Sequence, residues 1–157
     1  MGIHYFISQY LILQAVMPYA DKMLNYLNSE KIRTGVISNL CFSGNALKDH
    51  IDRLLPNNKL EFILASSDYI FKKPDPFMFD IALQKAGISA DKVWYCGDSI
   101  YCDVNGAHNV GIFPVLYEGS TAEENPSVHD NKEMNIPFEH LHIHDWRELI
   151  EIIENLK

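Results

Sequence analysis

The sequence predicts one α/β domain, built on a Rossmann-like parallel sheet with helices on both faces. Helical and strand patterns alternate along most of the 157 residues, which is typical of strands joined by crossover helices. A chain of 18.0 kDa with 47% hydrophobic and 22% charged residues has the composition of an ordinary globular domain. No linker or internal repeat interrupts the chain, so we expect residues 1–157 to form a single domain.

The amino-terminal segment is predicted to be a helix. From Ile3 to Gln14 its residues recur at i, i+3, i+4, i+7, i+8 and i+11, and all but the last are apolar. The β-branched and aromatic content of the segment leaves a strand as the alternative. A second apolar stripe at helical spacing follows Pro18, which suits a first helical turn, and runs to about Ser29.

Strand and helix patterns then alternate to the carboxyl terminus. Short apolar or β-branched runs predict strands at residues 32–38, 60–65, 93–96, 112–116 and 140–143. Apolar residues at helical spacing predict helices at 46–55, 76–86, 100–109 and 145–156. Asp75 and Gly87 fit the cap and the stop of one of these helices, and a polar loop is expected at 117–137.

Charge and cysteine content exclude several classes of partner. The chain has 13 Lys+Arg against 21 Asp+Glu, a net charge of −8, and no basic cluster longer than Lys72-Lys73, which argues against nucleic acid and membrane surfaces. Three cysteines without a C-x-x-C pair do not indicate a disulfide framework, and they fit a reducing cytoplasm. The apolar run at residues 3–16 lacks a basic start and is too short for a bilayer, so we expect no targeting or transmembrane segment.

Polar side chains follow the predicted strands at their carboxyl ends. Ser38 and Asn39 end one strand, Asp98 follows another, and Lys73 lies in the loop before a helix. Parallel sheets bind ligands beyond this edge, so we expect these groups to converge. A cation and hydrogen-bond donors suit phosphoryl oxygens, and carboxylates suit Mg²⁺. Asp98 and Asp103 are five residues apart across a strand-to-helix turn, so both could face one ion.

Three blocks that contain these residues follow one another along the chain: Val36-Ile37-Ser38-Asn39, Lys73-Pro74-Asp75-Pro76 and Gly97-Asp98-Ser99, the last continued by Asp103 and Gly106-Ala107. In this order they resemble the blocks of the haloacid dehalogenase (HAD) superfamily, in its phosphoglycolate phosphatase and β-phosphoglucomutase branch. The resemblance implies a HAD-like core that hydrolyses a small phosphorylated metabolite. It implies that Ser38, Asn39 and Lys73 bind the phosphoryl group, with Ser38 and Lys73 catalytic, and that Asp98 and Asp103 hold Mg²⁺.

One family block is missing from this sequence. In HAD enzymes an Asp-x-Asp at the end of the central strand supplies the nucleophile and the general acid, and this chain contains no Asp-x-Asp. The chain therefore resembles an amino-terminally truncated core whose cap is mostly absent, with residues 1–16 as a remnant of the cap region or a replacement for it. We expect the chain to be inactive and to bind Mg²⁺ weakly or not at all. The alternative is a non-catalytic remnant that acts as a binding or dimerisation module.

Loss of that strand would open a slot in the sheet, between the strand that ends at Ser38 and the strand that ends at Cys96. Either these two strands pair, or residues 3–13 fill the slot, or another polypeptide does. The sequence predicts a homodimer through residues 3–16, and the competing outcome is a monomer in which this segment packs on its own sheet.

The alternating residues His140, His142 and His144 would share one face of a strand, where they could bind Zn²⁺ or be solvated. The substrate cannot be read from this chain.

Overall fold

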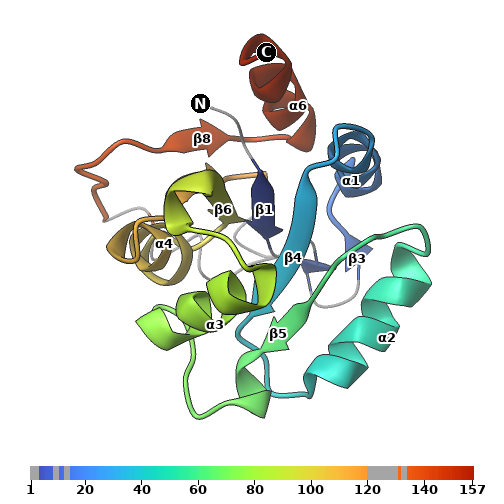
Figure 1. Ribbon diagram of the computed structural model, residues 1–157, viewed down its shortest axis with the longest axis vertical. Coiled ribbons are helices and arrows are strands. Elements are labelled where there is room, and N and C mark those ends of the chain that lie inside the picture. Colours follow the sequence, from blue (N-terminus) through green and yellow to red (C-terminus); the bar gives the residue numbers. More distant parts are fainter. Residues whose placement is uncertain (1–3, 9–10, 13–14, 120–130, 132–133) are drawn as a thin grey trace.

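The computed structural model describes residues 4–8, 11–12, 15–119, 131 and 134–157, and its main feature is a six-stranded parallel sheet (Figure 1). The strands follow the order β5-β4-β1-β6-β7-β8. Their bounds are β1 Tyr5–Ser8, β4 Arg33–Ser38, β5 Ile63–Ala65, β6 Val93–Gly97, β7 Phe113–Tyr117 and β8 Leu141–Ile143. Two short strands, β2 (Leu11–Ile12) and β3 (Ala15–Val16), pair with each other outside this sheet.

Helices cover both faces of the sheet, as the sequence predicts. One face packs against α1 (Ala20–Ser29), α2 (Gly44–Leu54) and α6 (Trp146–Asn155). The other face packs against α3 (Pro76–Ala86) and α4 (Asn105–Asn109) (Figure 1). Successive strand residues alternate between the two cores, since Val36 lies in the first core and Ile37 in the second. The predicted α/β class is therefore confirmed.

The predicted opening helix is wrong where the structure describes the segment. Tyr5–Ser8 forms β1, which lies in parallel between β4 and β6 and pairs with both. Residues 3, 9–10 and 13–14 of the predicted helix lie outside the described residues. Of the three outcomes expected for the slot, the structure shows the second, in which the amino-terminal segment fills it. The physical reason is that β4 and β6 would otherwise each present an unpaired backbone edge at the centre of the sheet.

The predicted cap and stop of the helix at residues 76–86 are confirmed. The Asp75 carboxylate caps α3 by accepting a hydrogen bond from the backbone N–H of Phe77 at 3.0 Å. Gly87 ends the same helix with φ of 62°, in the left-handed region that favours glycine. The predicted helix at 100–109 divides into a π-helix at Ile100–Val104 and α4. In the part of the chain described, no helix has the length and apolar character needed to cross a membrane.

Candidate functional site

A buried ion pair lies beyond the carboxyl ends of the central strands. The side chains of Lys73 and Asp103 are each 2% exposed, and Lys73 Nζ lies 2.5 Å from Asp103 Oδ1. Lys73 Nζ also donates a hydrogen bond to the hydroxyl of Tyr95, 2.8 Å away, on β6. That hydroxyl lies 3.1 Å from the same Asp103 oxygen and 3.4 Å from the backbone carbonyl of Ile37. Four groups from β4, β6, the loop before α3 and the π-helix therefore meet at one point.

The position of Asp103 depends on the turn after β6. Its second oxygen, Oδ2, accepts a hydrogen bond from the backbone N–H of Ser99 at 3.0 Å. The Ser99 hydroxyl accepts one from the N–H of Cys102 and so caps the π-helix that carries Asp103. A Cβ on Gly97 would lie 2.3 Å from the Asp103 carboxyl carbon, so only glycine at this position allows the carboxylate to approach so closely.

The amide of Asn39 joins the loop after β4 to the loop that carries Lys73. Asn39 Nδ2 donates to the Lys73 carbonyl at 2.9 Å, and the Lys73 N–H donates to Asn39 Oδ1 at 2.8 Å. Both backbone polar groups of Lys73 are thus bonded to one side chain. Ser38, which is 2% exposed, is the last residue of β4. The structure therefore brings together Asn39, Lys73 and Asp103, and Ser38 directly precedes Asn39 in the chain.

Asp98 follows β6 directly and is 5% exposed. Its backbone carbonyl accepts a hydrogen bond from Asn131 Nδ2 at 2.7 Å, and Asn131 Oδ1 accepts one from the N–H of Ile100 at 2.8 Å. Asn131 therefore fixes the backbone of the Asp98 turn. Sequence reasoning missed this residue, because Asn131 lies in a long polar loop where no pattern distinguishes it from its neighbours.

The electrostatics of the site follow from burial. Burial, and then the negative charge of Asp103, raises the pKa of Tyr95 well above its usual value, so its phenol stays protonated and able to donate. Lys73 and Asp103 balance each other, and the carboxyl of Asp98 adds a negative charge nearby when ionised. Sequence reasoning also missed Tyr95, although a hydroxyl within an otherwise apolar strand is a signal for a buried hydrogen bond.

The fit to Mg²⁺ can be judged from the oxygen atoms available. Both oxygens of Asp103 accept hydrogen bonds from groups of the chain itself: Lys73, Tyr95 and Ser99. Of the two predicted ligands, Asp103 is therefore already engaged within the protein, which leaves at most the carboxylate of Asp98 for a metal ion. Mg²⁺ held by one carboxylate takes its other ligands mainly from water and is bound weakly. The described residues thus do not form a dedicated Mg²⁺ site.

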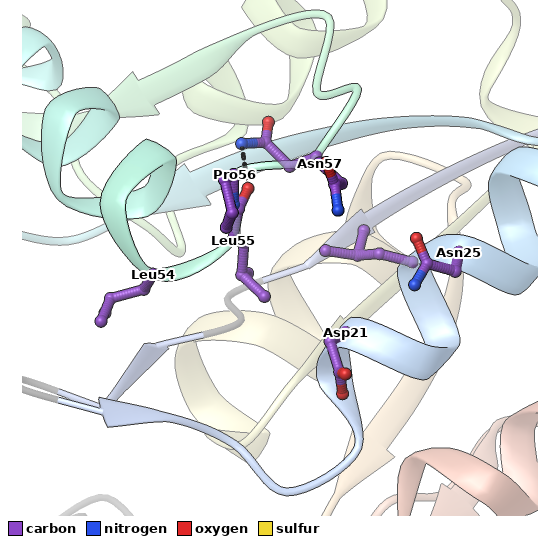
Figure 2. A pocket seen from close by; sticks show the side chains of 8 residues that line it. Asp21, Asn25, Leu54, Leu55, Pro56 and Asn57 are labelled. Atoms are coloured by element: carbon purple, nitrogen blue, oxygen red, sulfur yellow. Dashed lines mark hydrogen bonds between the residues drawn. The ribbon is translucent and has the colours of Figure 1, made fainter.

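A cavity of about 220 Å³ lies elsewhere, between α1 and the segment after α2 (Figure 2). Its walls include Asp21 and Asn25 from α1, and residues 54–58, where Asn58 Nδ2 donates to the Leu55 carbonyl at 2.8 Å. None of the predicted site residues lines this cavity. It therefore does not belong to the Lys73 cluster.

Comparison with known proteins identifies the family. Residues 11–116 match the model of the haloacid dehalogenase-like hydrolases, and the chain belongs to this family. It is 34% identical over 110 residues to the glyceraldehyde 3-phosphate phosphatase of Pyrococcus furiosus. The matched residues make up 68% of this chain and 44% of that protein. It is 29% identical to the mouse (Mus musculus) haloacid dehalogenase-like hydrolase domain-containing protein 3, over 80% of this chain and 47% of that protein. The chain thus spans less than half the length of these relatives.

Solved structures show the same fold. An uncharacterized protein from Listeria monocytogenes superposes with a TM-score of 0.77 at 17% identity and covers 98% of both chains. A HAD phosphatase from Thermococcus onnurineus superposes with a TM-score of 0.69 at 22% identity, over 88% of this chain and 58% of that one. The HAD-like core that the sequence resemblance implies is therefore confirmed.

Proposed function

We propose that this chain binds the phosphoryl group of a small phosphorylated metabolite and does not hydrolyse it on its own. The observation that carries the proposal concerns β1. This strand lies between β4 and β6, where HAD enzymes have the strand that ends in Asp-x-Asp, yet residues 1–20 contain neither aspartate nor glutamate. Neither the aspartyl nucleophile nor the general acid can come from this part of the chain.

The retained groups suit phosphate binding. An ammonium group has three donors, and the described contacts of Lys73 Nζ use two, with Tyr95 and Asp103. We propose that the third donor binds a phosphoryl oxygen, which requires an approach to an ammonium that is 2% exposed here. Ser38 and Asn39 supply further polar groups at the same edge. Asp103 and Tyr95 hold the ammonium in place, so little side-chain entropy remains to be lost on binding. Two relatives are named for phosphorylated sugars, glyceraldehyde 3-phosphate and ribulose 1,5-bisphosphate, which favours a ligand of that class.

Mg²⁺ has a secondary place in this proposal. Asp98 would hold it weakly, and a bound cation would offset the negative charge that otherwise opposes an incoming phosphate.

We also propose a cytoplasmic location, because none of the three cysteines forms a disulfide. Residues 1–157 would act as one domain in which residues 1–16 are a remnant of the cap region or a replacement for it.

The expected result is binding without turnover. We expect a titration of the chain with inorganic phosphate, followed by ³¹P chemical shifts, to give a dissociation constant of about 1 mM. This corresponds to a binding free energy of about −4 kcal/mol. Lys73→Met should abolish the shift and Lys72→Met should leave it, since the two lysines are adjacent and Lys73 is the buried one. Ser38→Ala provides a second variant that keeps the ion pair, should Lys73→Met fold poorly. The same sample should release no product from an aryl phosphate in the presence of Mg²⁺.

Two results would contradict the proposal. A shift that persists in both Lys73→Met and Ser38→Ala would place the phosphate elsewhere. Turnover that co-purifies with the chain and disappears in Asp98→Ala would mean that another carboxylate has taken over catalysis.

The alternative function is a dimerisation module, with the homodimer predicted through residues 3–16. In this segment Tyr5 is fully buried and β1 has a partner on each side, so β2 and β3 would have to supply the contact. Under this alternative, light scattering should give about twice 18.0 kDa, and Leu11→Asp should lower the mass. A mass of 18.0 kDa that does not change on dilution would exclude the alternative.

A further inference from the structure

A cluster of metal-binding side chains lies at the outer edge of the sheet, apart from the Lys73 site. It consists of Glu118, directly after β7, His142 on β8, and His144, directly after β8. We propose that these three side chains form a binding site for a divalent transition metal ion of the Zn²⁺ class. The proposal does not depend on the function proposed above.

The pairing of β7 with β8 brings these residues together. The two strands are parallel, with Leu116 opposite His142 and Tyr117 opposite Ile143. The ladder continues past both strands, because the N–H of Glu118 donates to the carbonyl of Ile143 at 2.8 Å. Side chains two residues apart share a face, so Glu118 lies on the same face as both histidines.

The distances fit a metal site that needs only small adjustments. Glu118 Oε2 lies 2.8 Å from His142 Nε2 and 3.9 Å from His144 Nε2, and one ligand atom from each residue lies within 4.8 Å of the others. Tetrahedral Zn²⁺ with bonds of about 2.0–2.1 Å places its ligand atoms roughly 3.3 Å apart. The three side chains are 35–63% exposed, so rotation can supply the difference without disturbing the core.

Glu148 supports the ring of His144 from the other side. Its Oε2 lies 3.8 Å from His144 Nδ1 and accepts a hydrogen bond from the His144 backbone N–H at 3.1 Å. A small rotation that brings this carboxylate within hydrogen-bond distance of Nδ1 would favour the tautomer that leaves Nε2 unprotonated, an arrangement typical of metal-ligating histidines. Glu118 and Glu148 also bring two negative charges, which outweigh the partial positive charge at the start of α6.

Ligand chemistry selects the class of ion. Two imidazoles and one carboxylate suit Zn²⁺, Ni²⁺ or Cu²⁺, whereas Mg²⁺ prefers oxygen ligands alone. His140 does not belong to the site, because its Nδ1 lies 2.9 Å from the Phe138 carbonyl and its ring centroid is 6.5 Å from that of His142. It is therefore a matched control of the same residue type, two residues before His142.

The test is a Zn²⁺ titration of the full chain. In long-range ¹H–¹⁵N spectra of the histidine rings, we expect shifts at His142 and His144 and none at His140. Affinity measured by calorimetry should fall on the order of 100-fold in His142→Ala, and about 10–100-fold in Glu148→Gln, which keeps the hydrogen bond to the backbone. His140→Ala should bind as the native chain does. None of these side chains is buried in the core, so unfolding temperatures without metal should agree.

Zn²⁺ could also bind to Cys41, to Cys102 or at Asp98, and the histidine spectra separate these outcomes. The proposal is overturned if the rings of His142 and His144 do not respond, or if the His142→Ala/His144→Ala double variant keeps the native affinity. Loss of phosphate binding in the Lys73 variants has no bearing on either result.

Discussion

The Ile7→Pro variant is expected to unfold, or to lose several kcal/mol of stability. Ile7 belongs to β1 and lies opposite Gly35 of β4 on one side and Tyr95 of β6 on the other. Proline has no N–H to donate to the ladder, and in sheets it is confined to edges and strand starts. Each buried backbone group left without a partner costs about 1–3 kcal/mol, and here the loss falls at the centre of the sheet.

Urea unfolding followed by circular dichroism measures the effect. The matched control is His4→Pro, because His4 is exposed, precedes β1 and donates only a 3.3 Å hydrogen bond to the Lys92 carbonyl. We expect a midpoint near that of the native chain for His4→Pro and a large decrease, or no folded baseline, for Ile7→Pro. Equal midpoints would mean that the segment is not the central strand and that β4 and β6 find another partner.

This strand is also where the prediction of the fold from sequence was wrong. A strand covered on both faces is apolar at successive positions, so a short apolar run satisfies the helical period as well as the strand period. The interactions that select a strand here are not local. They are the backbone hydrogen bonds to β4 and β6, which lie about 25 and 85 residues further along the chain. The helices and the other strands of the sheet were predictable because their signals are local, as with Asp75 and Gly87 at the two ends of α3.

Prediction of the site had a similar limit. Asn39 and Lys73 could be placed together because Asn39 follows a strand and Lys73 precedes a helix at one edge of the sheet. Asp103 could be placed near that edge only through its spacing from Asp98, across the turn after β6. The hydrogen bond from Lys73 to Tyr95 could not be predicted, because the two residues are 22 positions apart and no local pattern places the tyrosine hydroxyl beside the ammonium. The roles of Ser38, Asp98 and Asp103 toward phosphate and Mg²⁺ stay predictions. Likewise, the histidine spacing placed His142 and His144 on one face, but only the β7–β8 register brings Glu118 beside them.

Breaking the buried ion pair is expected to have the second large effect. Lys73→Met leaves the Asp103 carboxylate buried with its positive partner removed, and such a change costs about 3–5 kcal/mol. Asp103→Leu should cost at least as much, because the N–H of Ser99 and the hydroxyl of Tyr95 lose an acceptor as well. In the Lys73→Met/Asp103→Leu double variant no unpaired charge remains, so its loss should be smaller than the sum of the single losses.

Urea unfolding of the two single variants and the double variant gives this coupling free energy directly. The control is Lys48→Met, the same substitution in an exposed lysine–aspartate pair with Asp52, where we expect almost no change in midpoint. Additive losses would show that Lys73 and Asp103 do not form a buried pair in solution. Strong coupling would show that the pair stabilises the fold without any nucleophile. A chain that lacks the aspartates of the first block would then still have a structural reason to keep both residues.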